Sequence, residues 1–170
     1  MKPPALAREA IAHHLNSGAT LEPPAGLPPE LNSRAGVFVS LHQADGSLRG
    51  CIGTVEPLTP SVAEEIIANA VAAATTDPRF APVQANELAG LHLSVGILTP
   101  LVAEPNQLAL NPKQYGVMVA AADGRRGVLL PDLPGIATIE DQLEVCREKA
   151  AISPDEPVQI FKFQVTRYEE

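Results

Sequence analysis

The sequence predicts an α+β fold in which a mainly antiparallel sheet packs against about three helices. Two pairs of extended apolar segments are each joined by a short glycine-containing turn, Asp45-Gly46-Ser47 in the first pair and Asp123-Gly124 in the second. Such pairs are typical of β-hairpins. Segments with helical periodicity alternate with these hairpins, which disfavours a parallel sheet. The length suits one domain over residues 1–170, or two small, closely packed lobes that share one interface.

Three segments have the apolar spacing and the end signals of helices. The first covers residues 4–17, with a proline in its first turn and a glycine directly after it. The second covers residues 61–75, where either Thr59 caps the helix with Pro60 at its first position, or the initial serine and Glu64 form a capping box. The third covers residues 138–150. Residues 21–31 contain four prolines, which exclude a helix or a central strand and predict a linker.

Extended segments with apolar residues on at least one face predict the strands. They cover residues 36–42, 48–55, 91–98, 115–122, 126–130 and 158–168. Residues 101–112 lack such a pattern and are predicted to form a loop.

The composition limits the kinds of partner, and the cellular compartment, that can be expected for this protein. A net charge of -8 without a block of like charges argues against nucleic acid or an anionic membrane surface as the main partner. No apolar run approaches the roughly 20 residues that a membrane-spanning helix needs. The first residues do not lead into the apolar core of a signal peptide. Two cysteines without a secretory signal are typical of a cytoplasmic protein with free thiols.

The main candidate site is the stretch LRGCIGT at residues 48–54. Side chains alternate along a strand, so we expect one face to carry Leu48, Ile52 and Thr54 and the other to carry Arg49, Cys51 and Val55. A guanidinium beside a thiol favours the thiolate, which makes Cys51 and Arg49 candidate catalytic residues. Glycine weakens a strand, so Gly50 and Gly53 indicate that another backbone or a ligand comes close.

Two further segments carry reactive or recognition groups. The segment Asp77-Pro78-Arg79-Phe80 is predicted to be a turn. Either Asp77 only forms hydrogen bonds with the local backbone, or the turn is part of a functional site. His92 and Ser94 share a strand face and suggest a base and a nucleophile, although a partly exposed sheet face explains the same pattern. The candidate binding residues are therefore Gly50, Gly53, Thr54, Asp77, Arg79, Phe80 and His92. Cys146 lies on an apolar helix stripe and is expected to be a small buried hydrophobe.

At residues 48–54 the chain resembles the AMMECR-one domain family, whose signature is LRGCIGT. Other pieces resemble that family in order and spacing: GVFVSL, DPRF, EL, LHLSVGILTPL, GVLLP and QLEVCREKA. The similarity extends from about Ala5 to Tyr168. At Ala151 many relatives carry glycine, which puts the end of the third helix in doubt.

The resemblance implies a two-lobed α+β fold with the signature near the cleft between the lobes. In prokaryotes the family is protein A of the AmmeMemoRadiSam set. The resemblance therefore implies two partners, a Memo-type dioxygenase-like protein and a radical SAM protein. It implies no settled biochemical activity.

Three functional hypotheses remain open, beside a purely structural role in which the motif's small residues let the hairpin pack on the alanine-rich helix. In the first, Cys51 is the nucleophile of an enzyme or enzyme subunit that transfers an acyl or alkyl group or handles a radical-modified product, with His42 or His92 as the base. In the second, the Gly-Cys-Gly strand of a binding or scaffold protein accommodates a partner or a small ligand. In the third, Cys51 and a histidine bind a metal, but no paired-ligand spacing supports this, and no cofactor is expected.

Overall fold

The computed structural model describes residues 1–170 and has three helices and two four-stranded sheets, which confirms the predicted α+β class. The chain divides into two compact units. Residues 1–98 and 166–170 form the first unit, and residues 99–165 form the second. None of the helices is long and apolar enough to cross a membrane.

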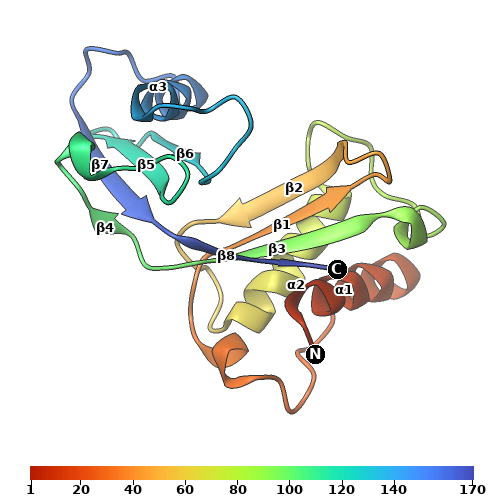
Figure 1. Cartoon of the computed structure of the whole chain (residues 1–170). Coiled ribbons are helices and arrows are strands. Elements are labelled where there is room, and N and C mark those ends of the chain that lie inside the picture. Colours follow the sequence, from red (N-terminus) through yellow and green to blue (C-terminus); the bar gives the residue numbers. More distant parts are fainter. The chain divides into compact units, whose positions relative to one another are not determined.

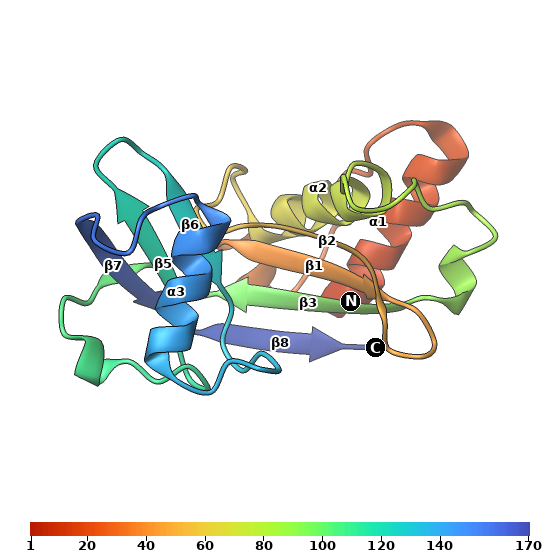
Figure 2. The same ribbon diagram turned by 90° about the horizontal axis from the view of Figure 1, so that it is seen from above.

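The first unit is a four-stranded sheet with two helices on one face (Figures 1 and 2). The strands follow the order β2-β1-β3-β8 across the sheet. Its elements are α1 (Pro3–Ser17), η1 (Pro29–Asn32), β1 (Val37–His42), β2 (Leu48–Thr54), α2 (Val62–Thr75), η2 (Leu88–Gly90), β3 (His92–Leu98) and β8 (Val165–Glu169).

The core of this unit lies between the helices and the sheet. Strand β1 alternates as expected, because Val37, Val39 and Leu41 are fully buried whereas the residues between them are half-buried. Helix α2 begins with the predicted capping box between Ser61 and Glu64. The helix-facing side of β1 is therefore apolar, and its opposite face carries Phe38, Ser40 and His42.

The second unit packs helix α3 against another antiparallel sheet, of strand order β4-β7-β5-β6. Its elements are β4 (Val102–Ala103), η3 (Gln107–Ala109), β5 (Gly116–Ala121), β6 (Arg126–Leu129), α3 (Ile139–Lys149) and β7 (Val158–Phe163). Cys146 is fully buried in the core of this unit, as predicted. Burial raises the pKa of its thiol to about 12.

Three sequence-based boundaries are wrong. Residues 158–168 form two strands, β7 and β8, which belong to different sheets. The expected loop at 101–112 contains β4, because Val102 and Ala103 pair with β7. The expected linker at 21–31 ends in η1, where Leu31 is 1% exposed and part of the core.

Candidate functional site

The motif LRGCIGT forms β2, an edge strand that contains a β-bulge. Gly50 lies opposite Leu41, whereas Leu48 lies opposite His42, so Arg49 has no partner on β1. A bulge turns two successive side chains toward the same face. Leu48 therefore shares a face with Arg49 and His42, and its expected position beside Ile52 and Thr54 is wrong. The expected placement of Arg49 and Cys51 on one face is consistent with this register.

The two glycines of the motif have different neighbours. A Cβ at Gly50 would lie 2.3 Å from the carbonyl oxygen of Ala73 on α2. The backbone of the strand therefore lies directly against the backbone of the helix at this position. A Cβ at Gly53 would lie 2.2 Å from the ring of Phe38. Gly50 thus lets the alanine-rich helix approach the strand, and Gly53 makes room for an aromatic side chain on the opposite face.

Cys51 lies half-buried in a row of polar side chains on the face away from the helices. It pairs with Ser40 on β1, which in turn pairs with Ser94 on β3. The Ser40 hydroxyl donates a hydrogen bond to the sulfur of Cys51, with an Oγ–Sγ distance of 3.1 Å. Hydrogen bonding to sulfur stabilises a thiolate relative to a thiol. The next pair of β1 and β3 on the same face consists of His42 and His92.

The backbone of Cys51 is fixed by an ion pair on the open edge of β2. Its N–H donates to Asp77 Oδ2 at 2.9 Å, and its carbonyl oxygen accepts from Arg79 Nη2 at 3.2 Å. The Arg79 side chain also donates two hydrogen bonds to the Asp77 carboxylate, of 2.7 and 3.0 Å, and the Arg79 N–H donates a third of 3.1 Å. Together they occupy the donor and the acceptor that a further strand would use, so they protect this edge.

The two members of this ion pair have different surroundings. Asp77 is 3% exposed, and the hydrogen bond from Arg79 holds its pKa far below the ordinary range, although burial opposes this shift. The Arg79 side chain is 55% exposed and lies over the ring of Phe80, 5.5 Å from its centroid. Its pKa is raised, chiefly by the hydrogen bond to the carboxylate of Asp77. Arg79 therefore presents a positive charge at the edge of the site.

The Arg49 side chain is directed to the segment that follows Arg79. It donates to both carboxylate oxygens of Glu87, at 3.2 to 3.3 Å, and to the carbonyl oxygen of Ala81 at 3.0 Å. A backbone hydrogen bond from Gln84 is the largest cause of the lowered pKa of Glu87, and Arg49 adds to it. The cation that the structure brings to Cys51 is therefore Arg79, and Arg49 holds the 81–87 segment.

Thr54 lies in a second polar cluster, on the helix-facing side of the sheet. Its hydroxyl donates to the carboxylate of Glu65, which is 1% exposed and also accepts hydrogen bonds from Leu58 and Thr59. The side chain of Asn69 donates to Thr54 and to the carbonyl oxygen of Val37. These bonds fix the loop after β2, and they separate Thr54 from the row that contains Cys51.

Comparison with known proteins identifies the family of this chain. The AMMECR1 family model matches residues 4–170. The chain belongs to the AMMECR1 family. It is 48% identical over 160 residues to a protein of Thermotoga maritima, with 93% of this chain and 91% of that protein covered. It is also 44% identical to protein CA_C1420 of Clostridium acetobutylicum, where 97% of this chain matches 35% of the longer protein.

A solved structure has the same fold. The crystal structure of uncharacterized protein PH0010 from Pyrococcus horikoshii superposes with a TM-score of 0.90 at 34% sequence identity. The match covers 99% of this chain and 89% of that one. The AMMECR1 architecture is thus shared over nearly the whole chain.

The side chains of this AMMECR1 protein do not form a metal site. No group of three or more histidine, cysteine and carboxylate side chains could hold a metal ion.

Two residues that contact the motif were not predicted from the sequence. Ser40 was not among the candidates, although the hairpin register could have placed it opposite Cys51. Glu87 was not predicted either, because no local motif indicates that it pairs with Arg49.

Proposed function

We propose that this AMMECR1-family protein is a catalytic subunit that transfers an acyl or alkyl group through a covalent bond to the sulfur of Cys51. The thiolate attacks the acyl or alkyl carbon of the substrate and displaces the group bonded to that carbon, which takes up a proton as it leaves. A nucleophilic group of the acceptor then attacks the same carbon and releases the Cys51 sulfur. The observation that carries the proposal is the hydrogen bond from Ser40 to a half-buried thiol whose backbone is fixed on both sides. A positioned thiolate is a strong nucleophile, and a fixed backbone lowers the entropic cost of aligning it with a substrate.

The neighbouring side chains have distinct proposed roles. Ser40 stabilises the thiolate. The exposed guanidinium of Arg79 binds a carboxylate or phosphate of the substrate, and Phe80 lines the same edge. His42 or His92 exchanges protons in the row next to Ser40 and Ser94. Asp77 acts indirectly, because it positions both Arg79 and the Cys51 backbone.

The proposed partners are a Memo-type dioxygenase-like protein and a radical SAM protein in the cytoplasm. Family membership supports the pairing, because the AMMECR-one signature characterises protein A of the AmmeMemoRadiSam set. In this arrangement the product of the partners reaches Cys51. The two unpaired thiols are consistent with a reducing compartment.

Alkylation kinetics test the nucleophile. Iodoacetamide should label Cys51 at pH 7 faster than it labels free N-acetylcysteine, whereas Cys146 serves as the internal unreactive thiol. Mass spectrometry of the digested protein assigns each modified site. Labelling of Cys51 no faster than the free thiol would contradict the proposal.

Partner capture tests the alternative scaffold role of the motif. Cys51→Ser should retain the melting temperature and both partners but lose the covalent intermediate. Arg49→Ala provides the contrasting variant, because it alters the 81–87 segment without removing the thiol. Loss of partners in Arg49→Ala, together with full cellular function in Cys51→Ser, would exclude the catalytic role of the thiol.

A further inference from the structure

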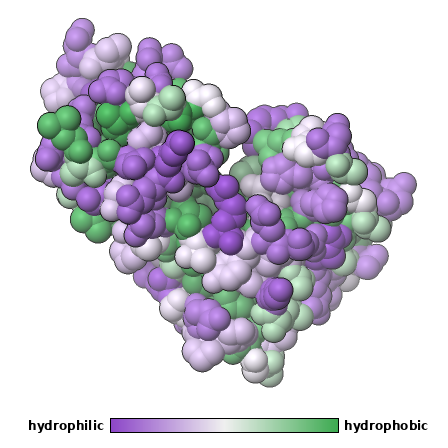
Figure 3. Space-filling view, viewed as in Figure 1, coloured by the Kyte–Doolittle hydropathy of each residue, from purple (hydrophilic) through white to green (hydrophobic).

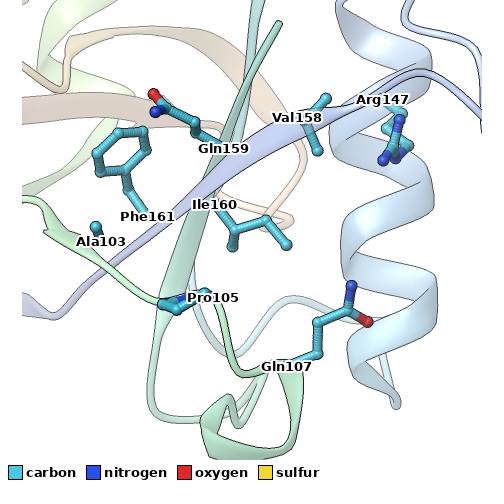
Figure 4. Close-up of a pocket in the computed structure, with 8 residues that line it drawn as sticks. All are labelled: Ala103, Pro105, Gln107, Arg147, Val158, Gln159, Ile160 and Phe161. Atoms are coloured by element: carbon cyan, nitrogen blue, oxygen red, sulfur yellow. The ribbon is translucent and has the colours of Figure 1, made fainter.

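A cavity of about 500 Å³ is lined only by residues of the second unit (Figure 4). Its volume falls within the range of known small-molecule sites, roughly 300–1,000 Å³. Three segments form its walls: strand β7, residues 103–107 and helix α3. The residues that line it are Ala103, Pro105, Gln107, Arg147, Val158, Gln159, Ile160 and Phe161.

Arg147 on α3 is the charged residue among those that line the cavity. Its Nη1 donates to the carbonyl oxygens of Ser153 and Glu156, at 2.7 and 2.9 Å, which holds the guanidinium in place. These two bonds use both N–H groups of Nη1, whereas Nε and Nη2 donate to no protein atom. Nε and Nη2 form one side of the guanidinium, and that side can bind a carboxylate through two parallel hydrogen bonds.

No acidic side chain lines the cavity to oppose this charge. Glu156, whose carbonyl oxygen binds Arg147, directs its carboxylate to Arg125. Glu144 and Glu148 on α3 are exposed and do not line the cavity. The cavity therefore favours a ligand with a negative charge.

The wall next to Arg147 is apolar. Val158 and Ile160 are half-buried and pack against the core of the second unit. In Figure 4 they project to the side of β7 on which Arg147 lies, whereas Gln159 and Phe161 project to the other side. On the face of the molecule shown in Figure 3, apolar residues are scattered among polar ones. A concave aliphatic wall beside a fixed charge is therefore a local feature, and it suits the hydrocarbon part of a small ligand.

One backbone position of β7 faces the same space. The N–H of Glu104 donates to the carbonyl oxygen of Ile160 at 2.9 Å, so the backbone groups of Ile160 point to the β4 side. Backbone groups of alternate strand residues point to the same neighbour, and those of Val158 therefore do so as well. Asn106, which would come next in this pairing, instead donates its N–H to the Glu104 side chain at 3.1 Å. The N–H of Val158 is thus a further donor beside the cavity.

We propose that this cavity binds a small aliphatic monocarboxylate. The carboxylate accepts two hydrogen bonds from Nε and Nη2 of Arg147, near the N–H of Val158, and the hydrocarbon tail lies against Val158 and Ile160. The guanidinium is already fixed before the ligand arrives, which lowers the entropic cost of binding. The site shares no residue with the row that contains Cys51, so this inference does not rest on the function proposed above.

Titration of the full chain with hexanoate tests the site, and the neutral hexanamide is the matched ligand. In ¹H–¹⁵N NMR spectra hexanoate should shift the Nε–H signal of Arg147 and the amide signals of residues 158–160. Hexanamide should bind roughly tenfold more weakly, because hydrogen bonds to a charged acceptor are lost. Acetate should also bind roughly tenfold more weakly than hexanoate, because it has no tail to bury against the aliphatic wall.

Protein variants provide the second arm. Arg147→Gln should weaken hexanoate binding roughly tenfold. Lys149→Gln is the matched control, because it removes the same charge from α3 but Lys149 is directed to the carbonyl oxygen of Val128 on β6. It should leave binding unchanged, as should Cys51→Ser, which tests independence from the thiol. If Arg147→Gln lowers the melting temperature, the comparison with hexanamide makes the same test on the unaltered protein.

Three results would overturn the proposal. Equal affinities for hexanoate and hexanamide would show that the cavity does not recognise the charge. Equal affinities for hexanoate and acetate would show that any small anion binds the guanidinium and that the apolar wall plays no part. Shift changes that are absent from Arg147 and residues 158–160, or confined to other residues, would place hexanoate outside the cavity.

Discussion

The carboxylate of Asp77 accepts a 2.9 Å hydrogen bond from the backbone N–H of Cys51, 26 positions earlier in the chain. Arg79 completes the arrangement with a bond to the carbonyl oxygen of the same cysteine. Two side chains of a turn thus take the place of a neighbouring strand. The motif and the DPRF turn, which look independent in the sequence, form one structural element.

The first prediction concerns the acid stability that Asp77 provides. Asp77→Asn should lower the free energy of unfolding at pH 7 by about 2 kcal/mol, because the charge-assisted bonds to Arg79 and Cys51 weaken. The folded-state pKa of Asp77 is lowered, so its stabilisation is complete above the unfolded pKa of about 3.9 and is lost as the pH falls below that value. Urea unfolding should show a constant difference from pH 7 to 5 that narrows below pH 4. Asp155→Asn, at an exposed site, is the control; a difference that widened in acid would contradict the argument.

The second prediction concerns the hydroxyl that contacts the sulfur. Ser40→Ala should slow the alkylation of Cys51 at pH 7 roughly three- to tenfold, because the thiolate loses its hydrogen-bond donor. Ser94→Ala is the matched control, since Ser94 lies in the same row but does not contact the sulfur through an observed hydrogen bond. Equal rates in the two variants would assign the reactivity of Cys51 to other groups.

The third prediction separates the two glycines of the motif. Gly50→Ala should destabilise the first unit by about 3 kcal/mol or more, because the added methyl meets the Ala73 carbonyl and backbone cannot yield easily. Gly53→Ala should cost only about 1–2 kcal/mol, because the half-buried ring of Phe38 can move aside. Chemical denaturation measures both free-energy changes. A larger loss of stability in Gly53→Ala than in Gly50→Ala would show that α2 moves to make room for the added methyl and that Phe38 does not.

The fourth prediction concerns the end of α3. Ala151 has a φ of 53°, and the N–H of Ile152 donates to the carbonyl oxygen of Arg147, as in a Schellman motif. A non-glycine residue pays about 1–2 kcal/mol for this left-handed conformation. Ala151→Gly should therefore raise the free energy of unfolding by about 0.5–1 kcal/mol, after the larger entropy of the unfolded glycine chain is subtracted. Calorimetry should show a melting temperature about 1–4 °C higher; Ala150→Gly, at the C-cap where φ is -103°, should lower it because glycine loses more conformational freedom on folding.

Local patterns predicted most of the secondary structure. The capping box at Ser61 and the alternation of Val37, Val39 and Leu41 depend only on neighbouring residues, and both are confirmed. The break between β7 and β8 could not be predicted, because no glycine or proline lies near Gln164. What separates these strands is their pairing, with β5 on one side of the break and β3 on the other.

The candidate site was predicted less completely than the fold. The placement of Cys51 on a polar face followed from strand alternation. The bulge at Arg49 did not, because it depends on how Leu41 and His42 pair with β2. The choice between Arg49 and Arg79 as the cation beside Cys51 is equally non-local, since Glu87 attracts one and Asp77 the other.

The discontinuous first unit has a consequence for synthesis on the ribosome. Strand β8 is translated after residues 99–165, yet it pairs with β3 from the first part of the chain. Until then, a nascent sheet of three strands exposes the unpaired side of β3 to solvent and to other chains. The second unit has all its strands in one continuous segment, so it can fold before β8 completes the first unit. Slow translation between β3 and β8 would therefore prolong the interval in which the emerging protein is most prone to aggregate.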